Sequence, residues 1–350
     1  MDMELNADQQ ALVDAAEQLL DEFKQAPRSG VMSAYSTGLQ QRLIDGDFAS
    51  VSLQSEYGLL EAALIVDVLS RAPYAIESAA SVLVAPAVLG ETLLGPIALV
   101  EDWQRPARFL SFAKHAFVRH EGGAVLIAID ADAIEAAPGM LAYPYGRFKR
   151  VPEWSRARRL NAEQCKALLQ WWRTSIAIEA AAAMGAATRF TIEYVTNRRQ
   201  FNRPIGSFQA VQHRIAKGAV HSEGARLIAL EAAAKGDALT STLAVTYATR
   251  FIGELVEDLH QFNGALGITL DHPLHYWTYR LLALQSELGG VGQHSLAAAG
   301  VAWSDGVLGP RLVKIEARHS GFDSYAIRAP GALPVRSAFD FPSFLNRGEP

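Results

Sequence analysis

Apolar residues in the first part of the chain recur at steps of one, three and four, a spacing that places them on one face of a helix. The first such run follows Asn6, which with Gln9 fits a capping box at a helix start. Further helices are expected at about 38–45, 59–71 and 74–89. Residues 1–95 are therefore predicted to form a helical domain.

The pattern changes after residue 95 to short apolar runs separated by prolines, charged residues or a glycine pair, which is typical of strands. The runs are PIALVE, ARFLSF, HAFVRH and GAVLIAID. Residues 96–152 are thus predicted to form a small β middle domain. Its roughly fifty residues are few for a sheet that must bury a cofactor.

Long helical stretches rich in alanine follow over 153–300, and small side chains of this kind let the helices of a bundle approach closely. A loop with the sequence NRRQFNRPIGSFQ joins two of them. Residues 301–350 are rich in glycine and proline and are predicted to be irregular, without an assignable role. The expected fold class is mainly α with a small β middle domain.

The composition is that of an ordinary globular protein, with 20% charged residues and a net charge of −5, so no electrostatic footprint for nucleic acid is present. The N-terminus lacks the basic and apolar regions of a secretory signal, and the single Cys165 cannot form an internal disulfide. We expect a cytoplasmic protein without a metal site. The apolar stretch 79–100 is interrupted by proline, glycine and glutamate, which argues against a membrane span.

Basic residues nevertheless cluster at 147–160, where RFKRVPEWSRARRL holds six Arg or Lys in fourteen positions. The favoured interpretation is a solvated connection between two domains. The alternative is a binding segment for the phosphates of CoA or of a nucleotide.

Three segments carry a resemblance to a known family. The loop RRQFNRPIGSFQAVQH at 198–213 closely resembles the acyl-CoA dehydrogenase family. The segments YGLLEAALIVDVLSRA and QFNGALGITLDHPLHYWTYR also resemble it, in its N-terminal helical domain and in a second flavin-contacting region. The resemblance covers most of 5–300 and is weakest in the middle domain. It implies an N-terminal helical domain, a β domain, a C-terminal four-helix bundle and FAD as cofactor.

The same resemblance implies which residues contact the cofactor. In that family the loop arginine reaches across a subunit interface to the FAD pyrophosphate of a neighbour, a role for which a guanidinium suits because its fork pairs with phosphate oxygens. The other contacts would border the adenosine portion, with glycines that bring the backbone close. Asn202 and Ala265 are departures, because the family usually has glycine there. The implied cofactor-binding residues are Arg198, Gln200, Phe201, Gln261, Gly264 and Gly267. The plain alternative for the loop is a solvent-facing connection.

The family's chemistry also requires a glutamate that removes the α-proton of an acyl-CoA while a hydride passes to the flavin. The two positions where the family places this base match Gly289 and Trp172 here, and neither is a carboxylate. Glu287 lies two residues before the first position and is the remaining candidate base. The favoured interpretation of Glu287 is an exposed residue at a helix end. The middle domain also lacks the segment that covers the flavin ring in active members.

A chain that keeps the contacts to a neighbour's cofactor but lacks a base resembles the non-catalytic subunits of heteromeric acyl-CoA dehydrogenases from bacterial steroid catabolism. This implies an α2β2 assembly in which an unlike subunit supplies the glutamate and the acyl-CoA site, with FAD shared at the interface. Two alternatives remain, a homomeric dehydrogenase that uses Glu287 and a degenerate, non-enzymatic assembly subunit. The acyl group cannot be identified from the sequence.

Overall fold

The computed structural model describes residues 5–23, 26–27, 31–139 and 141–304, and the described residues up to Ala302 form one compact unit. Most of the segment expected to be irregular, 305–350, lies outside the described residues. Residues 301–304 are helical, because they continue the last helix, α10 (Gly290–Ser304). Within the described part of the chain, no helix is both long and apolar enough to cross a membrane.

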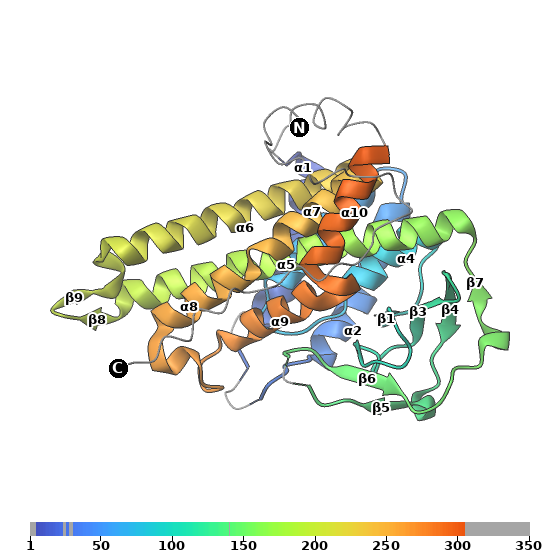
Figure 1. Cartoon of the computed structure of the whole chain (residues 1–350), viewed down its shortest axis with the longest axis horizontal. Coiled ribbons are helices and arrows are strands. Elements are labelled where there is room, and N and C mark those ends of the chain that lie inside the picture. The colour runs from blue at the N-terminus through green and yellow to red at the C-terminus, as the bar shows by residue number, and fades with distance from the viewer. Residues whose placement is uncertain (1–4, 24–25, 28–30, 140, 305–350) are drawn as a thin grey trace, which may run out of the picture. The chain divides into compact units, whose positions relative to one another are not determined.

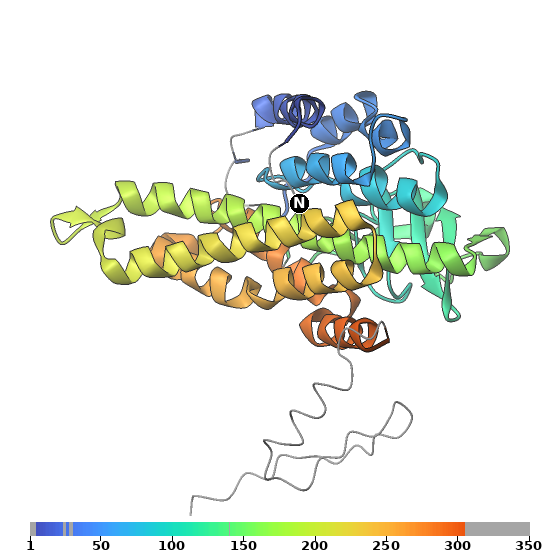
Figure 2. The same ribbon diagram turned by 90° about the horizontal axis from the view of Figure 1, so that it is seen from above.

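The N-terminal region is helical, as predicted, and packs along one side of the long bundle helices (Figure 2). The expected capping box is present, since the Asn6 side chain accepts from the Gln9 backbone N–H and the Gln9 side chain accepts from that of Asn6. The α-helices are α1 (Ala7–Leu20), α2 (Thr37–Asp45), α3 (Leu59–Ser70) and α4 (Ala85–Leu89).

The helix expected over 74–89 begins later than predicted. A π-helical turn, Ala79–Val84, leads directly into α4, and residues 74–78 are not helical. The buried Glu77 carboxylate explains this start, because its Oε1 accepts hydrogen bonds from the backbone N–H groups of Ala80 and Ser81 at 2.9 and 3.1 Å. A side chain that caps a helix from outside lies before its first turn.

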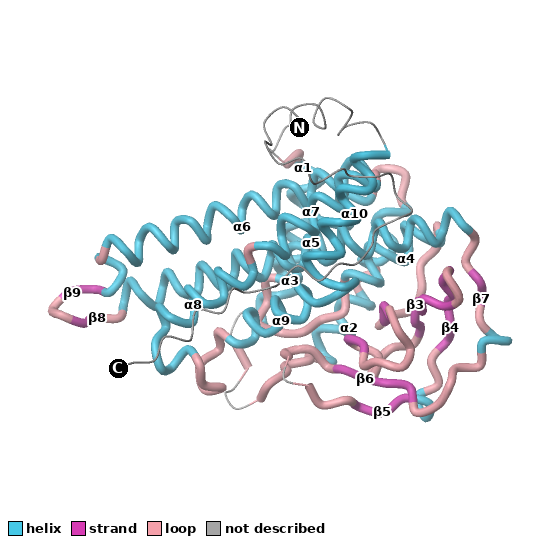
Figure 3. The backbone as a smooth tube through the Cα atoms, in the orientation of Figure 1, coloured by secondary structure: helices cyan, strands magenta, loops and turns pink. Residues whose placement is uncertain are grey.

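The β unit consists of two short sheets that face each other across a small apolar core (Figures 1 and 3). One sheet has the order β1-β3-β4-β7, with β1 and β3 parallel and the other neighbours antiparallel. Its strands are β1 (Ile97–Val100), β3 (His115–His120), β4 (Gly123–Ala128) and β7 (Arg158–Arg159). The other sheet is antiparallel and contains β2 (Ala107–Arg108), β6 (Tyr145–Phe148) and β5 (Ile134–Ala136).

Three of the four apolar runs form strands close to the predicted positions, but the strand expected over ARFLSF is limited to two residues. Phe109 has φ of 62°, a left-handed conformation that a strand does not contain. The backbone therefore turns away directly after Arg108.

The bundle is built around the 36-residue helix α5 (Ala162–Asn197), which packs against α6, α7, α8 and α9 (Figure 1). Alanine is the most frequent residue on its buried face, in agreement with the close packing expected from the sequence. Helices α7 and α8 are separated only by Phe251, so the two together run as one side of the bundle. The remaining bounds are α6 (Gln209–Lys235), α7 (Ala238–Arg250), α8 (Ile252–Gly267) and α9 (His275–Ser286).

Candidate functional site

A hairpin projects from one end of the bundle between α5 and α6 (Figure 1). Its strands β8 (Arg199–Gln200) and β9 (Arg203–Pro204) pair antiparallel and leave Phe201 and Asn202 as a two-residue turn. Both turn residues have positive φ, 52° and 61°. Asparagine tolerates this conformation, whereas phenylalanine rarely adopts it. The Phe201 side chain is also 85% exposed, and strain combined with an exposed aromatic ring points to a functional role.

Contacts within the hairpin hold its backbone while leaving Arg198 available. The Ile205 N–H donates to the Arg198 carbonyl at 2.8 Å, and the Arg203 guanidinium lies 3.9 Å from the centre of the Phe208 ring. The rings of Phe208 and Phe201 meet edge to face at 6.0 Å. The Arg198 side chain is exposed and forms no hydrogen bond or ion pair with the described residues. Its fork is thus open to a ligand or to another chain.

The second predicted segment lies at the end of α8, where two glycines are required by the backbone. Gly264 has φ 61° and ψ −152°, a conformation open essentially to glycine alone. A Cβ atom at Gly267 would lie 2.7 Å from the Cβ of Asn263, too close for any other residue without a shift. The Asn263 amide donates to Thr191 Oγ1 of α5 at 3.0 Å, which fixes this turn against the bundle. Gln261 is exposed beside it.

The two segments lie at the same end of the bundle. Thr191 is less than two turns from the end of α5, where the hairpin begins. Near the start of α6, Arg214 forms an ion pair with Asp258 of α8 and lies 5.1 Å from the centre of the Phe262 ring. The six residues named from the sequence are therefore brought to one end of the bundle. Which ligand they contact stays a prediction.

A cleft of about 630 Å³ lies elsewhere in the molecule, between the β unit and the bundle. Trp172, one of the two positions matched to a base, lines the cleft, and so does Glu287. Gly289, the other position, has φ of 81° and no side chain to offer. The walls are mostly polar and carry charges of both signs, including Arg105, Arg108, Arg119, Glu101, Glu121 and Glu287.

A buried ion cluster forms one wall of this cleft. Arg108, 9% exposed, donates from Nη1 and Nη2 to the two carboxylate oxygens of Glu179 at 3.0 and 3.1 Å, and from Nε to Glu287 Oε1. The Trp172 indole N–H donates to Glu287 Oε2 at 2.9 Å, and the guanidinium lies 4.5 Å from the centre of the Tyr143 ring. Burial lowers the pKa of Arg108, but Glu179 and Glu287 outweigh it and hold that pKa well above its usual value.

The interpretation of Glu287 as an exposed residue is wrong. It does follow the end of α9, but its side chain turns inward and is only 17% exposed. Each of its oxygens accepts one hydrogen bond, from Arg108 or from Trp172, and these contacts hold the carboxylate in the ion cluster. Arg108 and Glu179 were not predicted from the sequence. A lone glutamate within the apolar run IAIEAAAAMG was the one signal that a buried cation lies nearby.

Comparisons with known proteins find similarity that is concentrated in the bundle. Residues 163–295 match the acyl-CoA dehydrogenase C-terminal domain. The acyl-CoA dehydrogenase IpdE2 of Mycolicibacterium smegmatis is 33% identical over 110 residues, which cover 31% of this chain and 35% of that protein. The match thus spans about a third of the length of this relative.

Two solved structures share the fold over most of the chain. In the ChsE4–ChsE5 complex from Mycobacterium tuberculosis, one chain matches with a TM-score of 0.68 and 18% identity, covering 91% of this chain and 100% of that one. The steroid acyl-CoA dehydrogenase Tcur3481–Tcur3483 matches with a TM-score of 0.71 and 19% identity, covering 86% and 99%. The predicted fold, mainly α with a small β middle region and of the acyl-CoA dehydrogenase type, is confirmed.

Proposed function

We propose that this chain, whose bundle matches the acyl-CoA dehydrogenase C-terminal domain, is the non-catalytic subunit of a heteromeric acyl-CoA dehydrogenase. Its bundle end contacts the phosphates and adenosine of an FAD held mainly by an unlike subunit. That partner carries the catalytic glutamate and the acyl-CoA, and the assembly is α2β2. Bound FAD supplies the hydride acceptor for α,β-desaturation.

The observation that carries this proposal is the exposed hairpin with Arg198 and Phe201 at the bundle end. The positive φ of Phe201 costs on the order of 1 to 3 kcal/mol. Its exposed ring buries too little apolar surface to offset that cost in water. Contact with another chain and its cofactor accounts for both features. Arg198 would pair with phosphate oxygens through its fork.

The residues present fit one end of FAD and not the other. At the bundle end, an open guanidinium and the glycine backbone at Gly264 suit a pyrophosphate and a nucleoside, which approach backbone closely. In the cleft, the wall is taken by the Arg108–Glu179–Glu287 cluster, and a polar, charged wall is a poor surface for an apolar flavin ring. The difference between the bundle end and the cleft supports binding of a neighbour's cofactor at the bundle end. We call the hairpin with Arg198 and the turn at Gly264 the clasp.

The homomeric alternative rests on Glu287, which does line the cleft. A general base needs a carboxylate oxygen within reach of the substrate proton. Here each carboxylate oxygen already accepts a hydrogen bond, from Arg108 or from Trp172, and the tie to this buried cluster disfavours Glu287 as the base. In addition, the ChsE4–ChsE5 structure is described as a complex of two proteins, which makes an unlike partner the better expectation.

The assembly and its flavin content test the proposal. The chain is co-expressed with a glutamate-bearing acyl-CoA dehydrogenase subunit, and native mass spectrometry is combined with flavin quantification. We expect a heterotetramer with half as many FAD molecules as chains, and little or no FAD on this chain alone. A stable assembly of this chain alone with one FAD per subunit would contradict the proposal, and a complex without FAD would favour a non-enzymatic assembly subunit.

An arginine variant tests the clasp within the same complex. Arg198→Ala should weaken FAD binding roughly ten- to hundredfold, because it removes a charge-assisted contact to phosphate. Arg250→Ala is the matched control, since Arg250 is also exposed but lies at the junction of α7 and α8. Equal FAD affinity in both variants would remove Arg198 from the cofactor site.

A further inference from the structure

The basic segment 147–160 has one arginine that differs from the others. Lys149 donates to a backbone carbonyl, that of Asp132, at 3.0 Å. Four arginines form ion pairs with carboxylates: Arg147–Glu135, Arg156–Glu153, Arg158–Glu91 and Arg159–Glu121. Arg150 forms no ion pair or hydrogen bond through its side chain with any residue that the structure describes. A cation without a counter-ion in such a segment is a candidate anion contact.

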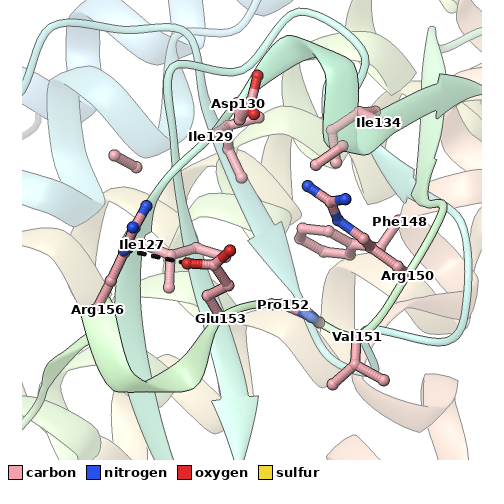
Figure 4. A pocket seen from close by; sticks show the side chains of 12 residues that line it. Ile127, Ile129, Asp130, Ile134, Phe148, Arg150, Val151, Pro152, Glu153 and Arg156 are labelled. Atoms are coloured by element: carbon pink, nitrogen blue, oxygen red, sulfur yellow. Dashed lines mark ion pairs between the residues drawn. The ribbon is translucent and has the colours of Figure 1, made fainter.

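Arg150 lies at a pocket of about 370 Å³ on the β unit (Figure 4). The pocket opens at the edge of the small core between the two sheets, and its floor is apolar. Ile127 and Ile134 belong to that core and are each 8% exposed, while Ile129 and Phe148 pack against it. Two short sheets do not close over these side chains, so apolar surface remains in contact with water.

The charges around the pocket leave one cation available. Figure 4 shows the Arg150 guanidinium pointing into the pocket beside Phe148, opposite Glu153. Glu153 is already paired with Arg156 at 3.0 Å. The Asp130 carboxylate points away from Arg150 and accepts from the backbone N–H of Asp132 at 3.1 Å. A ligand therefore meets an apolar floor and one unpaired guanidinium.

We propose that this pocket binds a small carboxylate with an apolar body. The body covers the isoleucine and phenylalanine floor, and the carboxylate pairs with Arg150. The volume lies near the lower end of the range of about 300 to 1,000 Å³ for small-molecule sites. A monoanion fits better than a phosphate, because the pocket wall also carries Asp130, which forms no ion pair with the described residues and repels additional negative charge.

This site is separate from the clasp and from the cleft, and none of its lining residues belongs to either. Calorimetric titration of the full chain with decanoate, decanol and decylammonium, each below its aggregation concentration, tests it. We expect one decanoate per chain, bound about three- to fivefold more tightly than the other two probes. Equal affinity for decanoate and decanol would overturn the proposal, and so would the absence of decanoate binding.

Two variants assign the binding to the pocket. Arg150→Gln should weaken decanoate binding about three- to fivefold, whereas Arg147→Gln should not, because Arg147 is exposed in the same segment but does not line the pocket. Ala128→Trp should abolish binding by filling the space, with the far-UV circular dichroism unchanged. Decanoate binding that is insensitive to both Arg150→Gln and Ala128→Trp would place the ligand elsewhere. FAD content of the heteromeric complex should be the same in all variants, so this proposal and the proposed function can fail separately.

Discussion

Arg108 shows how a single residue decides the character of the cleft. A buried guanidinium is costly unless it is paired, and here two carboxylates from separate parts of the chain satisfy it. Glu179 comes from the middle of α5, and Glu287 from the turn after α9. The carboxylate that the sequence left as a candidate base is therefore part of a structural ion cluster that joins the β unit to the bundle.

Substitution of Glu287 separates the structural role from a catalytic one. Glu287→Gln should lower the free energy of unfolding by about 1 to 3 kcal/mol, because Arg108 loses one of its two carboxylates while keeping Glu179. Turnover of the assembled complex should stay nearly unchanged. Urea unfolding and steady-state kinetics measure the two effects.

The control for that substitution is Glu163→Gln, which removes only an exposed pair with Lys166 and should change stability by no more than about 0.5 kcal/mol. Loss of a true general base would instead reduce turnover by roughly a hundredfold or more with flavin still bound. That outcome would overturn the non-catalytic assignment.

At the scale of elements, helix starts that depend on contacts between neighbouring residues could be predicted from the sequence. The capping box at Asn6 marks the start of α1 correctly, because all of its contacts lie within one turn. The helix over 74–89 was misplaced, since its start depends on Glu77. That residue's backbone N–H donates to the side chain of Gln40, which lies 37 positions away. A hydrogen bond between residues so far apart in the sequence is not visible in the spacing of hydrophobic and polar residues.

The same distinction explains which parts of the candidate site were found. The hairpin and the α8 turn are contiguous segments, so the resemblance to a known family could identify them. The Arg108–Glu179–Glu287 cluster joins residues 71 and 179 positions apart, and only the packed structure reveals it. The early end of β2 also escaped prediction, because Phe109 adopts a positive φ that no residue-type preference indicates.

The turn at the end of α8 offers a prediction about an element. Gly264→Ala should lower the free energy of unfolding by roughly 1 to 3 kcal/mol, because φ 61° and ψ −152° are strained for any residue with a Cβ. Gly292→Ala in α10 is the matched control, since nothing lies within 4 Å of the added Cβ and the helix favours alanine. Chemical denaturation compares them. A free energy of unfolding for Gly264→Ala equal to or above that of the wild type would show that this turn does not require glycine.

At the scale of the whole molecule, Glu77 lies where α2, the helical turn that leads into α4 and the start of β1 meet. Its backbone N–H and C=O are hydrogen-bonded by the Gln40 amide of α2, and its carboxylate accepts from the Ile97 N–H at the start of β1. Burial raises the pKa of Glu77 to about 7, although the N–H groups of Ile97, Ser81 and Ala80 act in the opposite direction. The junction between helices and sheet thus contains a group that titrates near neutral pH.

The pH dependence of stability follows from that shift. The usual pKa of 4.5 applies to the unfolded chain, so between about pH 4.5 and 7 the folded protein retains a proton that the unfolded chain has released. The contribution of Glu77 to stability is therefore fully present below pH 4.5 and falls as the pH rises to 7. From pH 5 to pH 8 the loss should be roughly 2 to 3 kcal/mol.

Comparison with Glu77→Gln isolates this effect from all other titrating groups, because the glutamine does not titrate and its own cost is the same at each pH. Urea unfolding at pH 5, 6, 7 and 8 should show the difference in unfolding free energy, wild type minus variant, decreasing by about 2 to 3 kcal/mol. Glu56→Gln, at an exposed carboxylate, is the matched control for the substitution itself. A difference for Glu77→Gln that is constant, or that increases with pH, would mean that the three backbone donors outweigh burial and keep Glu77 ionised at the junction.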